Sequence, residues 1–218
     1  MCGKLFAIDP NDFIISRKRK KYKFAKFFNA ANCFEFDEWV HRQVDYIEVG
    51  AGTGCFSLEL ARRHPDKVFM AIDVKADRLQ KGAYAAIEQG VTNLYFVRAR
   101  GDQIDELIEQ ESLEGVWVTF ADPFPRRRSA GRRLSHPTYL RKYMHILRPS
   151  GHLYFKHDNP EFFQWTLEQL VAEKWRINEL AFDLHVSELP DDYKVLTTYE
   201  TRWLDEGRDT QFVRASKP

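Results

Sequence analysis

The chain has 218 residues, a length that typically forms one domain around a single buried core. Hydrophobic residues make up 44% of the sequence and charged residues 30%, which is typical of a globular protein and argues against a disordered or fibrous chain. No apolar run reaches the roughly 18 residues of a membrane-spanning helix, and no signal peptide is evident, so we expect a cytoplasmic protein without membrane association. The three cysteines, Cys2, Cys33 and Cys55, form no CxxC pair, which argues against a disulfide framework and a zinc site.

The net charge of +1 conceals two strongly basic segments. Residues 1–30 carry a net charge of +6 and residues 126–148 one of +8, so the rest of the chain is acidic. Lysines alternate with aromatic residues within 17–27, a pattern suited to phosphate contacts and base stacking. We therefore expect residues 1–40 to form a basic arm that binds a polyanion, ahead of a main domain at 41–218. A solvated face or an amphipathic docking helix is the alternative.

From residue 45 onward, short apolar runs alternate with amphipathic segments, as in a parallel sheet whose strands are connected by helices. The predicted strands are residues 46–49, 68–72, 94–97, 116–120 and 152–156. The predicted helices are residues 56–63, 76–89, 104–108, 139–147 and 161–175. Two further segments, 198–204 and 210–215, flank a polar turn at 205–209 and predict an antiparallel hairpin. The sequence thus predicts an α/β, Rossmann-like fold with a mostly parallel seven-stranded sheet, helices on both faces and a C-terminal hairpin.

A glycine-rich segment, Glu-Val-Gly-Ala-Gly-Thr-Gly at 48–54, lies between the first strand and the first helix. Gly50 and Gly52 allow a tight turn and close approach of a ligand to the backbone. The spacing is GxGxG, and Cys55 stands where a dinucleotide-binding GxGxxG pattern has its third glycine, which disfavours a dehydrogenase. Asp73 ends the second strand, where a carboxylate can accept hydrogen bonds from ribose hydroxyls, and Glu48 could face a charged end of the ligand. The alternative is that both acids merely end their strands.

A second candidate segment, Phe-Ala-Asp-Pro-Phe-Pro-Arg at 120–126, follows the fourth strand. Proline fixes its own φ and restricts the residue before it, so Asp122 is expected to be held rigidly. Five arginines lie within the eight positions 126–133, and we expect them to contact phosphates.

These segments together resemble bacterial tRNA (guanine-N7)-methyltransferases. Residues 120–134 are similar to the family signature F-x-D-P-W-P-K-x-R-H-x-x-R-R-L, and residues 48–54 to its E-I-G-x-G-x-G. Residues 156–159 resemble its K-T-D-N, and residues 197–200 its T-x-Y-E. The resemblance spans roughly residues 15–215, and the joint pattern is more specific than any one motif.

The resemblance implies a class I methyltransferase that transfers a methyl group from S-adenosylmethionine to N7 of a guanine in the variable loop of tRNA. It implies a catalytic role for Asp122, between cofactor and guanine. The cofactor contacts that it implies are Glu48, Gly50, Gly52, Asp73, Arg100, Asp102 and Asp122. The nucleotide contacts that it implies are Arg126, Asp158, Thr197 and Glu200.

The chain also departs from the family pattern. Phe124 replaces the usual Trp, Arg126 the usual Lys, Ser129 the usual His and His157 the usual Thr. The family's Asp-Ala pair near the adenine is Arg100-Gly101 here, with Asp102 as the nearest carboxylate. These departures leave two alternatives, a catalytically weakened RNA-binding relative and a methyltransferase of another RNA. A monomer and a homodimer are both compatible with the sequence.

Overall fold

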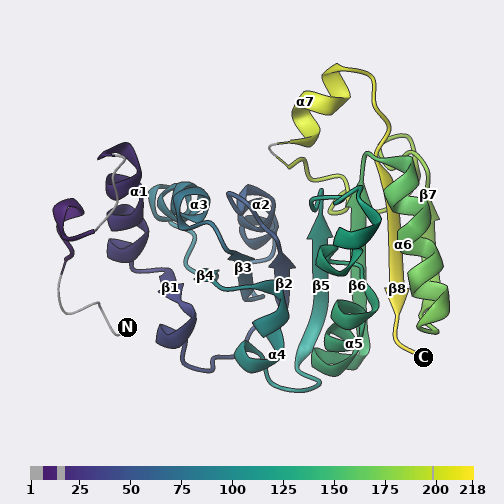
Figure 1. Cartoon of the computed structure of the whole chain (residues 1–218), viewed down its shortest axis with the longest axis horizontal. Coiled ribbons are helices and arrows are strands. Elements are labelled where there is room, and N and C mark those ends of the chain that lie inside the picture. The colour runs from purple at the N-terminus through teal and green to yellow at the C-terminus, as the bar shows by residue number, and fades with distance from the viewer. Residues whose placement is uncertain (1–6, 14–17, 198) are drawn as a thin grey trace.

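The computed structural model of the chain describes residues 7–13, 18–197 and 199–218. Eight strands form one sheet in the order β1-β4-β3-β2-β5-β6-β8-β7 (Figure 1). The strands are β1 (Cys33–Glu35), β2 (Tyr46–Val49), β3 (Phe69–Asp73), β4 (Leu94–Arg98), β5 (Leu113–Thr119), β6 (Leu147–His157), β7 (Arg176–Ala181) and β8 (Gln211–Ser216). The α-helices are α1 (Lys18–Asn29), α2 (Cys55–Arg63), α3 (Ala76–Glu88), α4 (Ile104–Leu107), α5 (Pro137–Ile146), α6 (Pro160–Ala172) and α7 (Glu200–Asp205).

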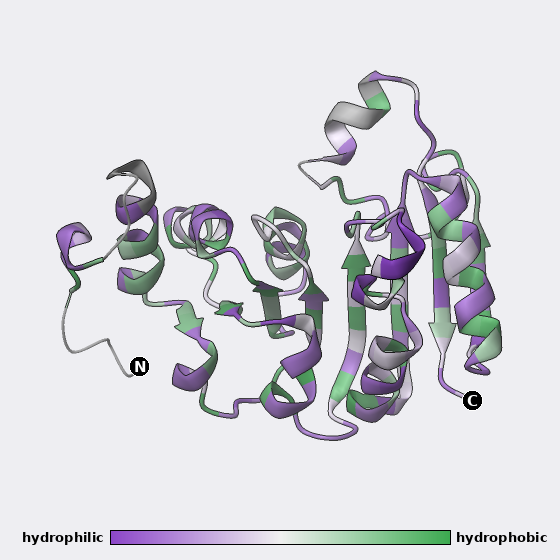
Figure 2. Cartoon of the chain, viewed as in Figure 1, coloured by the Kyte–Doolittle hydropathy of each residue, from purple (hydrophilic) through white to green (hydrophobic). Residues whose placement is uncertain are grey.

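The sheet separates two apolar cores because successive strand side chains point to opposite faces. In β3, Met70 and Ile72 join the core beneath α4, α5 and α6, whereas Phe69 and Ala71 join the core beneath α2 and α3. Apolar residues dominate β5 in the middle of the sheet, and the helices mix polar and apolar residues (Figure 2). The predicted α/β fold, with helices on both faces of a mostly parallel sheet, is therefore confirmed.

The sheet has eight strands where the sequence predicts seven, and the extra parallel strand lies within the predicted arm. The three residues of β1 pair with β4, and Cys33 and Phe34 are buried. Phe27 of α1 is also buried, with α1 packed against α3. A three-residue strand is too short to show an alternating pattern, which is why the sequence did not reveal it. Arg17 and the residues at 1–6 and 14–16 lie outside the described residues.

The predicted hairpin at 198–215 is wrong in its first half. Residues 200–205 form helix α7, and β8 pairs in antiparallel fashion with β6 and β7. The sequence did not predict β7, the antiparallel neighbour of β8 at the edge of the sheet. As an edge strand it exposes Arg176, Ile177 and Asn178 and shows no clear apolar alternation. Residue 198 lies outside the described residues. Within the described ranges, no helix combines the length and apolar character needed to cross a membrane.

Candidate functional site

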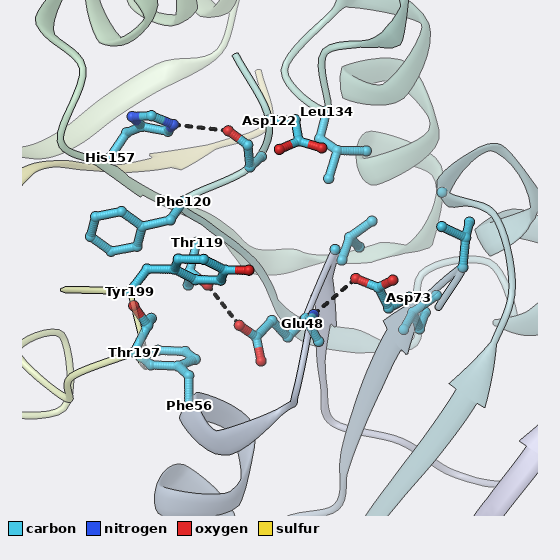
Figure 3. Close-up of a pocket in the computed structure, with 18 of the residues that line it drawn as sticks. Glu48, Phe56, Asp73, Thr119, Phe120, Asp122, Leu134, His157, Thr197 and Tyr199 are labelled. Atoms are coloured by element: carbon cyan, nitrogen blue, oxygen red, sulfur yellow. Dashed lines mark hydrogen bonds between the residues drawn. The ribbon is translucent and has the colours of Figure 1, made fainter. Parts of the chain in front are cut away.

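A cavity of about 1100 Å³ opens at the carboxyl ends of the parallel strands, where ligands bind in open α/β sheets (Figure 3). The loops after β2, β3, β4, β5 and β6 line it, together with Thr197, Tyr199 and Arg208 from the segment that precedes β8. Almost every residue that the sequence predicts as a cofactor or nucleotide contact lies on this wall. The exceptions are Arg126 and Glu200.

The glycine turn after β2 forms one side of the cavity. Gly50 and Gly52 have φ values of 79° and 59°, in the left-handed region that favours glycine. A Cβ atom on Gly50 would lie only 2.9 Å from the Cδ1 atom of Leu134, across the cavity mouth. The turn therefore favours glycine at position 50 for its backbone conformation, and a side chain there would displace the end of the Leu134 side chain.

Asp73 at the end of β3 holds this turn in place. Its Oδ2 atom accepts a hydrogen bond of 2.9 Å from the backbone N–H of Gly52, and its Oδ1 atom accepts one of 2.8 Å from the N–H of Lys75. Each oxygen keeps further acceptor capacity, and the side chain lines the cavity. Asp73 thus ends its strand structurally and is also available to a ligand's hydroxyl groups.

Glu48 lies on the cavity wall, although its side chain is almost fully buried. Its carboxylate accepts hydrogen bonds from the hydroxyls of Ser57, at 2.6 Å, and Thr119, at 2.7 Å. Burial raises the pKa of Glu48, and these hydroxyls and the distant Lys156 ammonium offset only part of the effect. A cationic group of a ligand beside Glu48 would favour its ionised form.

Arg100 and Asp102 form an ion pair at the rim after β4. The Nε atom of Arg100 donates to Oδ1 of Asp102 at 2.9 Å, and a second guanidinium nitrogen contacts Oδ2. Both residues line the cavity, as does Gly101 between them. A Cβ atom on Gly101 would lie 3.0 Å from Leu134, so this wall is closely packed. A ligand bound at this rim would therefore meet Arg100 and Asp102 as a preformed ion pair.

The turn after β5 carries Asp122 into the cavity from the opposite side. Phe120 and Phe124 flank it with φ values of 47° and 40°, a conformation that non-glycine residues rarely adopt. Asp122 is exposed to the cavity, and in Figure 3 its carboxylate lies beside Leu134. The loop after β5 thus places one carboxylate on the cavity wall that faces the glycine turn.

Asp158 follows β6 and contributes a second carboxylate to the same region. Its Oδ2 atom lies 3.1 Å from Nη1 of Arg208, and its Oδ1 atom 3.2 Å from Nδ1 of His157. The contact with His157, and to a lesser degree Arg208, holds the pKa of Asp158 below its usual range against the effect of burial. Asp158 is thus an ionised acceptor at the cavity wall.

The family model of putative methyltransferases matches residues 42–213. A tRNA (guanine-N(7)-)-methyltransferase of Brevibacillus brevis is 34% identical over 171 residues, which cover 78% of this chain and 79% of that protein. The corresponding protein of Cytophaga hutchinsonii is also 34% identical, over 77% of each chain.

The chain belongs to the tRNA (guanine-N7)-methyltransferase family. Members of this family take the methyl group from S-adenosylmethionine, so the cofactor predicted from the sequence is confirmed, and the dehydrogenase alternative is wrong.

Solved structures with a similar fold include two rRNA methyltransferases. The 16S rRNA methyltransferase KamB aligns with a TM-score of 0.60 and 17% identity, over 81% of this chain and 90% of that one. The 16S rRNA (adenine(1408)-N(1))-methyltransferase of Catenulisporales acidiphilia aligns with a TM-score of 0.59 and 16% identity, over 99% and 96%. At such identities the likeness shows the fold alone.

In this methyltransferase, the Thr-x-x-Glu segment at 197–200 forms the start of helix α7. The Oγ1 atom of Thr197 accepts from the N–H of Glu200, and a carboxylate oxygen of Glu200 accepts from the N–H of Thr197, both at 3.0 Å. This reciprocal pair is a capping box, a local helix-start motif. Thr197 still lines the cavity, whereas Glu200 is fully buried and its carboxylate is turned away from it.

The Glu200 carboxylate is bound inside the protein. Nζ of Lys156 lies 2.8 Å from Oε2, and Nε2 of His185 lies 2.8 Å from Oε1. Burial opposes ionisation of Glu200, but the bonds from His185 and Lys156 prevail and lower its pKa. A direct contact between Glu200 and a nucleotide, as the resemblance implies, is incompatible with this arrangement. Glu200 can influence the site only through the segment that it anchors.

Lys156 in β6 anchors that segment. It is fully buried, and besides Glu200 its ammonium binds the carbonyl oxygens of Val195, at 2.6 Å, and Tyr193, at 3.3 Å. Burial lowers the pKa of Lys156, while Glu200 acts in the opposite direction. One buried ammonium thus binds Tyr193, Val195 and Glu200 to β6. These contacts position the segment that brings Thr197 and Tyr199 to the cavity.

Arg126 lies on the exposed outer side of the turn after β5, outside the cavity wall.

Several apolar and aromatic residues that line the cavity were not predicted from the sequence. These are Phe56, Phe120, Leu134, Tyr139 and Tyr199. They come from four separate segments, so that only the topology reveals their proximity. Phe120 and Leu134 lie inside the signature at 120–134 and Tyr199 inside the Thr-x-Tyr-Glu motif, and these motifs were the available signals.

Proposed function

We propose that this enzyme transfers a methyl group from S-adenosylmethionine to N7 of a guanine in tRNA, and that this guanine lies in the variable loop. The observation that carries the proposal is one cavity with a glycine turn on one side and two carboxylates, Asp122 and Asp158, on the other. The family relatives named tRNA (guanine-N(7)-)-methyltransferase support the substrate and the position of methylation.

The cofactor half of the cavity fits an adenosyl sulfonium ligand. Asp73 retains acceptor capacity for the ribose hydroxyls, and Glu48 would face the cationic amino-acid end. Gly50 and Gly52 leave room for close approach to the backbone. The Arg100–Asp102 pair would border the adenine. The bound cofactor supplies an electrophilic methyl group.

The base half suits a guanine that is methylated at N7. N7 has a lone pair and no proton, so the reaction requires alignment and no general base. The product base is cationic, and the Asp122 carboxylate would stabilise the developing charge. Asp158 can accept hydrogen bonds from guanine N1–H and N2–H₂, a donor pattern that adenine lacks. A base within tertiary structure must first be exposed, as in base flipping.

Positive charge around the cavity suits the phosphates of tRNA. Arg126, Arg127 and Arg128 are exposed beside the turn after β5, and Lys75 and Arg78 line the other rim. We include the basic part of the predicted arm, up to Lys26, in this surface. The reaction would take place in the cytoplasm, with a monomer or a homodimer as the active form.

Mapping of modified nucleosides tests the proposed function. Purified enzyme is incubated with S-adenosylmethionine and unmodified tRNA, and the product is digested and analysed by mass spectrometry. We expect 7-methylguanosine at a single variable-loop position. Methylation at another atom of guanine, at another nucleoside, or only in ribosomal RNA would contradict the proposal.

Removing the exposed arginine cluster should weaken tRNA binding and reduce its salt dependence. With Arg126, Arg127 and Arg128 all replaced by Gln, the slope of log Kd against log salt should fall by about 0.7–0.9 for each phosphate that the variant no longer neutralises. The measurement is filter binding over a salt series. A matched control replaces the exposed Lys174 and Arg176, at the opposite end of the strands, by Gln. An equal slope for the cluster variant and the wild type would exclude the cluster as an RNA-binding surface.

A further inference from the structure

Arg133 is turned inward, toward the backbone of the turn that carries Asp122. Its Nε atom donates to the carbonyl oxygen of Pro123 at 2.9 Å, and its Nη2 atom to that of Phe124 at 3.2 Å. The guanidinium also stacks over the ring of Trp165, 4.3 Å from its centroid. The planar fork is therefore engaged on two carbonyls and one aromatic face, unlike the exposed arginines at 126–128.

His157 holds the other end of the same turn. Its Nε2 atom lies 2.8 Å from the carbonyl oxygen of Ala121, and because a carbonyl only accepts, Nε2 carries a proton. The other ring nitrogen, Nδ1, lies 2.9 Å from the backbone nitrogen of Asn159 and 3.2 Å from Oδ1 of Asp158, so the ring is fixed on both sides. The buried ring also packs edge-on against Phe162, at 4.9 Å.

Asp122 lies between the bound carbonyl groups of Ala121 and Pro123, and its own side chain is not held by a contact of this kind. Its carboxylate forms no hydrogen bond or ion pair with any residue in the described ranges of the chain. The backbone on both sides is strained, with positive φ at Phe120 and Phe124, and such a conformation persists only where its surroundings impose it. The position of the carboxylate is thus determined by what holds the backbone.

We propose that Arg133 and His157 are positioning residues that fix the catalytic carboxylate of Asp122 by binding the carbonyls of residues 121, 123 and 124. This inference rests on the proposed function, in which Asp122 acts on the guanine undergoing methylation. Methyl transfer to N7 depends on alignment, and a displacement of about 1 Å can cost on the order of 100-fold in rate. Arg133 would therefore contribute to kcat without touching RNA or cofactor.

Arg133→Lys is the first test, because lysine keeps the charge but lacks the planar fork that binds two carbonyls. We expect kcat to fall on the order of 100-fold, while the KM for tRNA, the salt dependence of tRNA binding and the Kd of S-adenosylmethionine stay at wild-type values. Arg141→Lys is the matched control, because Arg141 is exposed and forms its ion pair with Glu173, away from the turn after β5. It should leave all four quantities unchanged.

Three further variants separate positioning from general stability. In the Asp122→Asn background, Arg133→Lys should cause little additional loss in single-turnover rate, since its effect passes through Asp122. His157→Gln, which keeps an N–H donor near Ala121, should retain more activity than His157→Leu. Thermal unfolding of each variant shows the folded fraction, to which the rates are normalised.

Three results would overturn the inference. One is a raised KM for tRNA in Arg133→Lys with kcat retained, which would mean that the guanidinium of Arg133 binds the RNA directly. The second is a lower melting temperature of Arg133→Lys with a normal kcat of the folded protein. The third is an equal loss of single-turnover rate on Arg133→Lys substitution in the wild type and in the Asp122→Asn background. If the wild-type enzyme itself forms no 7-methylguanosine in tRNA, the proposed function fails, and this inference fails with it.

Discussion

Replacing Asp122 by asparagine should lower the single-turnover rate of methyl transfer about 100- to 1,000-fold, and alanine should lower it further. In the proposed function this carboxylate stabilises the positive charge that develops on the guanine, and preorganised groups of this kind typically contribute factors of this size. Binding of tRNA should change little, because the arginines that we propose to bind phosphates, Arg126, Arg127 and Arg128, are separate residues on the exposed side of the turn. Stability should stay within about 0.5 kcal/mol, since Asp122 is exposed.

The measurement is formation of 7-methylguanosine under single-turnover conditions, with filter binding of tRNA in parallel. Asp66→Asn is a suitable control, because Asp66 is an exposed carboxylate before β3, at the opposite end of the strands. Turnover of Asp122→Asn within about threefold of the wild type would exclude the proposed catalytic role.

Replacing Lys156 by methionine should destabilise the protein by about 3–5 kcal/mol, because it leaves the fully buried Glu200 carboxylate without its cation. The melting temperature should fall by roughly 6–20 °C for a domain of this size. The residue should also prove necessary for activity, since Thr197 and Tyr199 reach the cavity on the segment that Lys156 fastens.

Urea and thermal unfolding of Lys156→Met, Glu200→Gln and the double variant measure the coupling. We expect the double variant to be less destabilised than the sum of the single variants, because it removes both charges. Lys67→Met is the control, since the partly exposed Lys67–Glu114 pair should contribute no more than about 1 kcal/mol. A destabilisation by Lys156→Met as small as that by Lys67→Met would contradict the assigned role.

The same pair has a consequence for stability in acid. The pKa of Glu200 is lowered in the folded protein, so its ionisation stabilises the fold above the unfolded-state pKa of about 4.3. That contribution should be lost as the pH falls below this value and through the lowered folded-state pKa. In Glu200→Gln the corresponding part of the acid destabilisation should be absent.

The sequence predicted those parts of the molecule whose signals are local. The strand, glycine turn and helix at 46–63 show apolar periodicity and φ-specific glycines within one short stretch, and Asp73 ends a strand at the expected spacing. The cavity wall at Asp122 and Asp158 followed because both residues come after strands of a parallel sheet, whose carboxyl ends meet at one edge.

What the sequence did not predict depends on distant contacts. Glu200 belongs to a motif associated with nucleotide binding, but its bond to Lys156 spans 44 positions and turns it into the core. Arg133 belongs to a basic run that predicts phosphate binding, yet Trp165 and two carbonyls draw it inward. In both cases residue type and spacing are compatible with two roles, and only packing decides between them.

The placement of β8 has a consequence for biosynthesis. Although β8 is the latest of the eight strands in chain order, it lies between β6 and β7. During translation both neighbours therefore emerge with unpaired edges, which are templates for intermolecular pairing until residues 211–216 have left the ribosome. Nascent chains arrested before that point should aggregate or recruit chaperones, whereas chains that have passed it can complete the sheet.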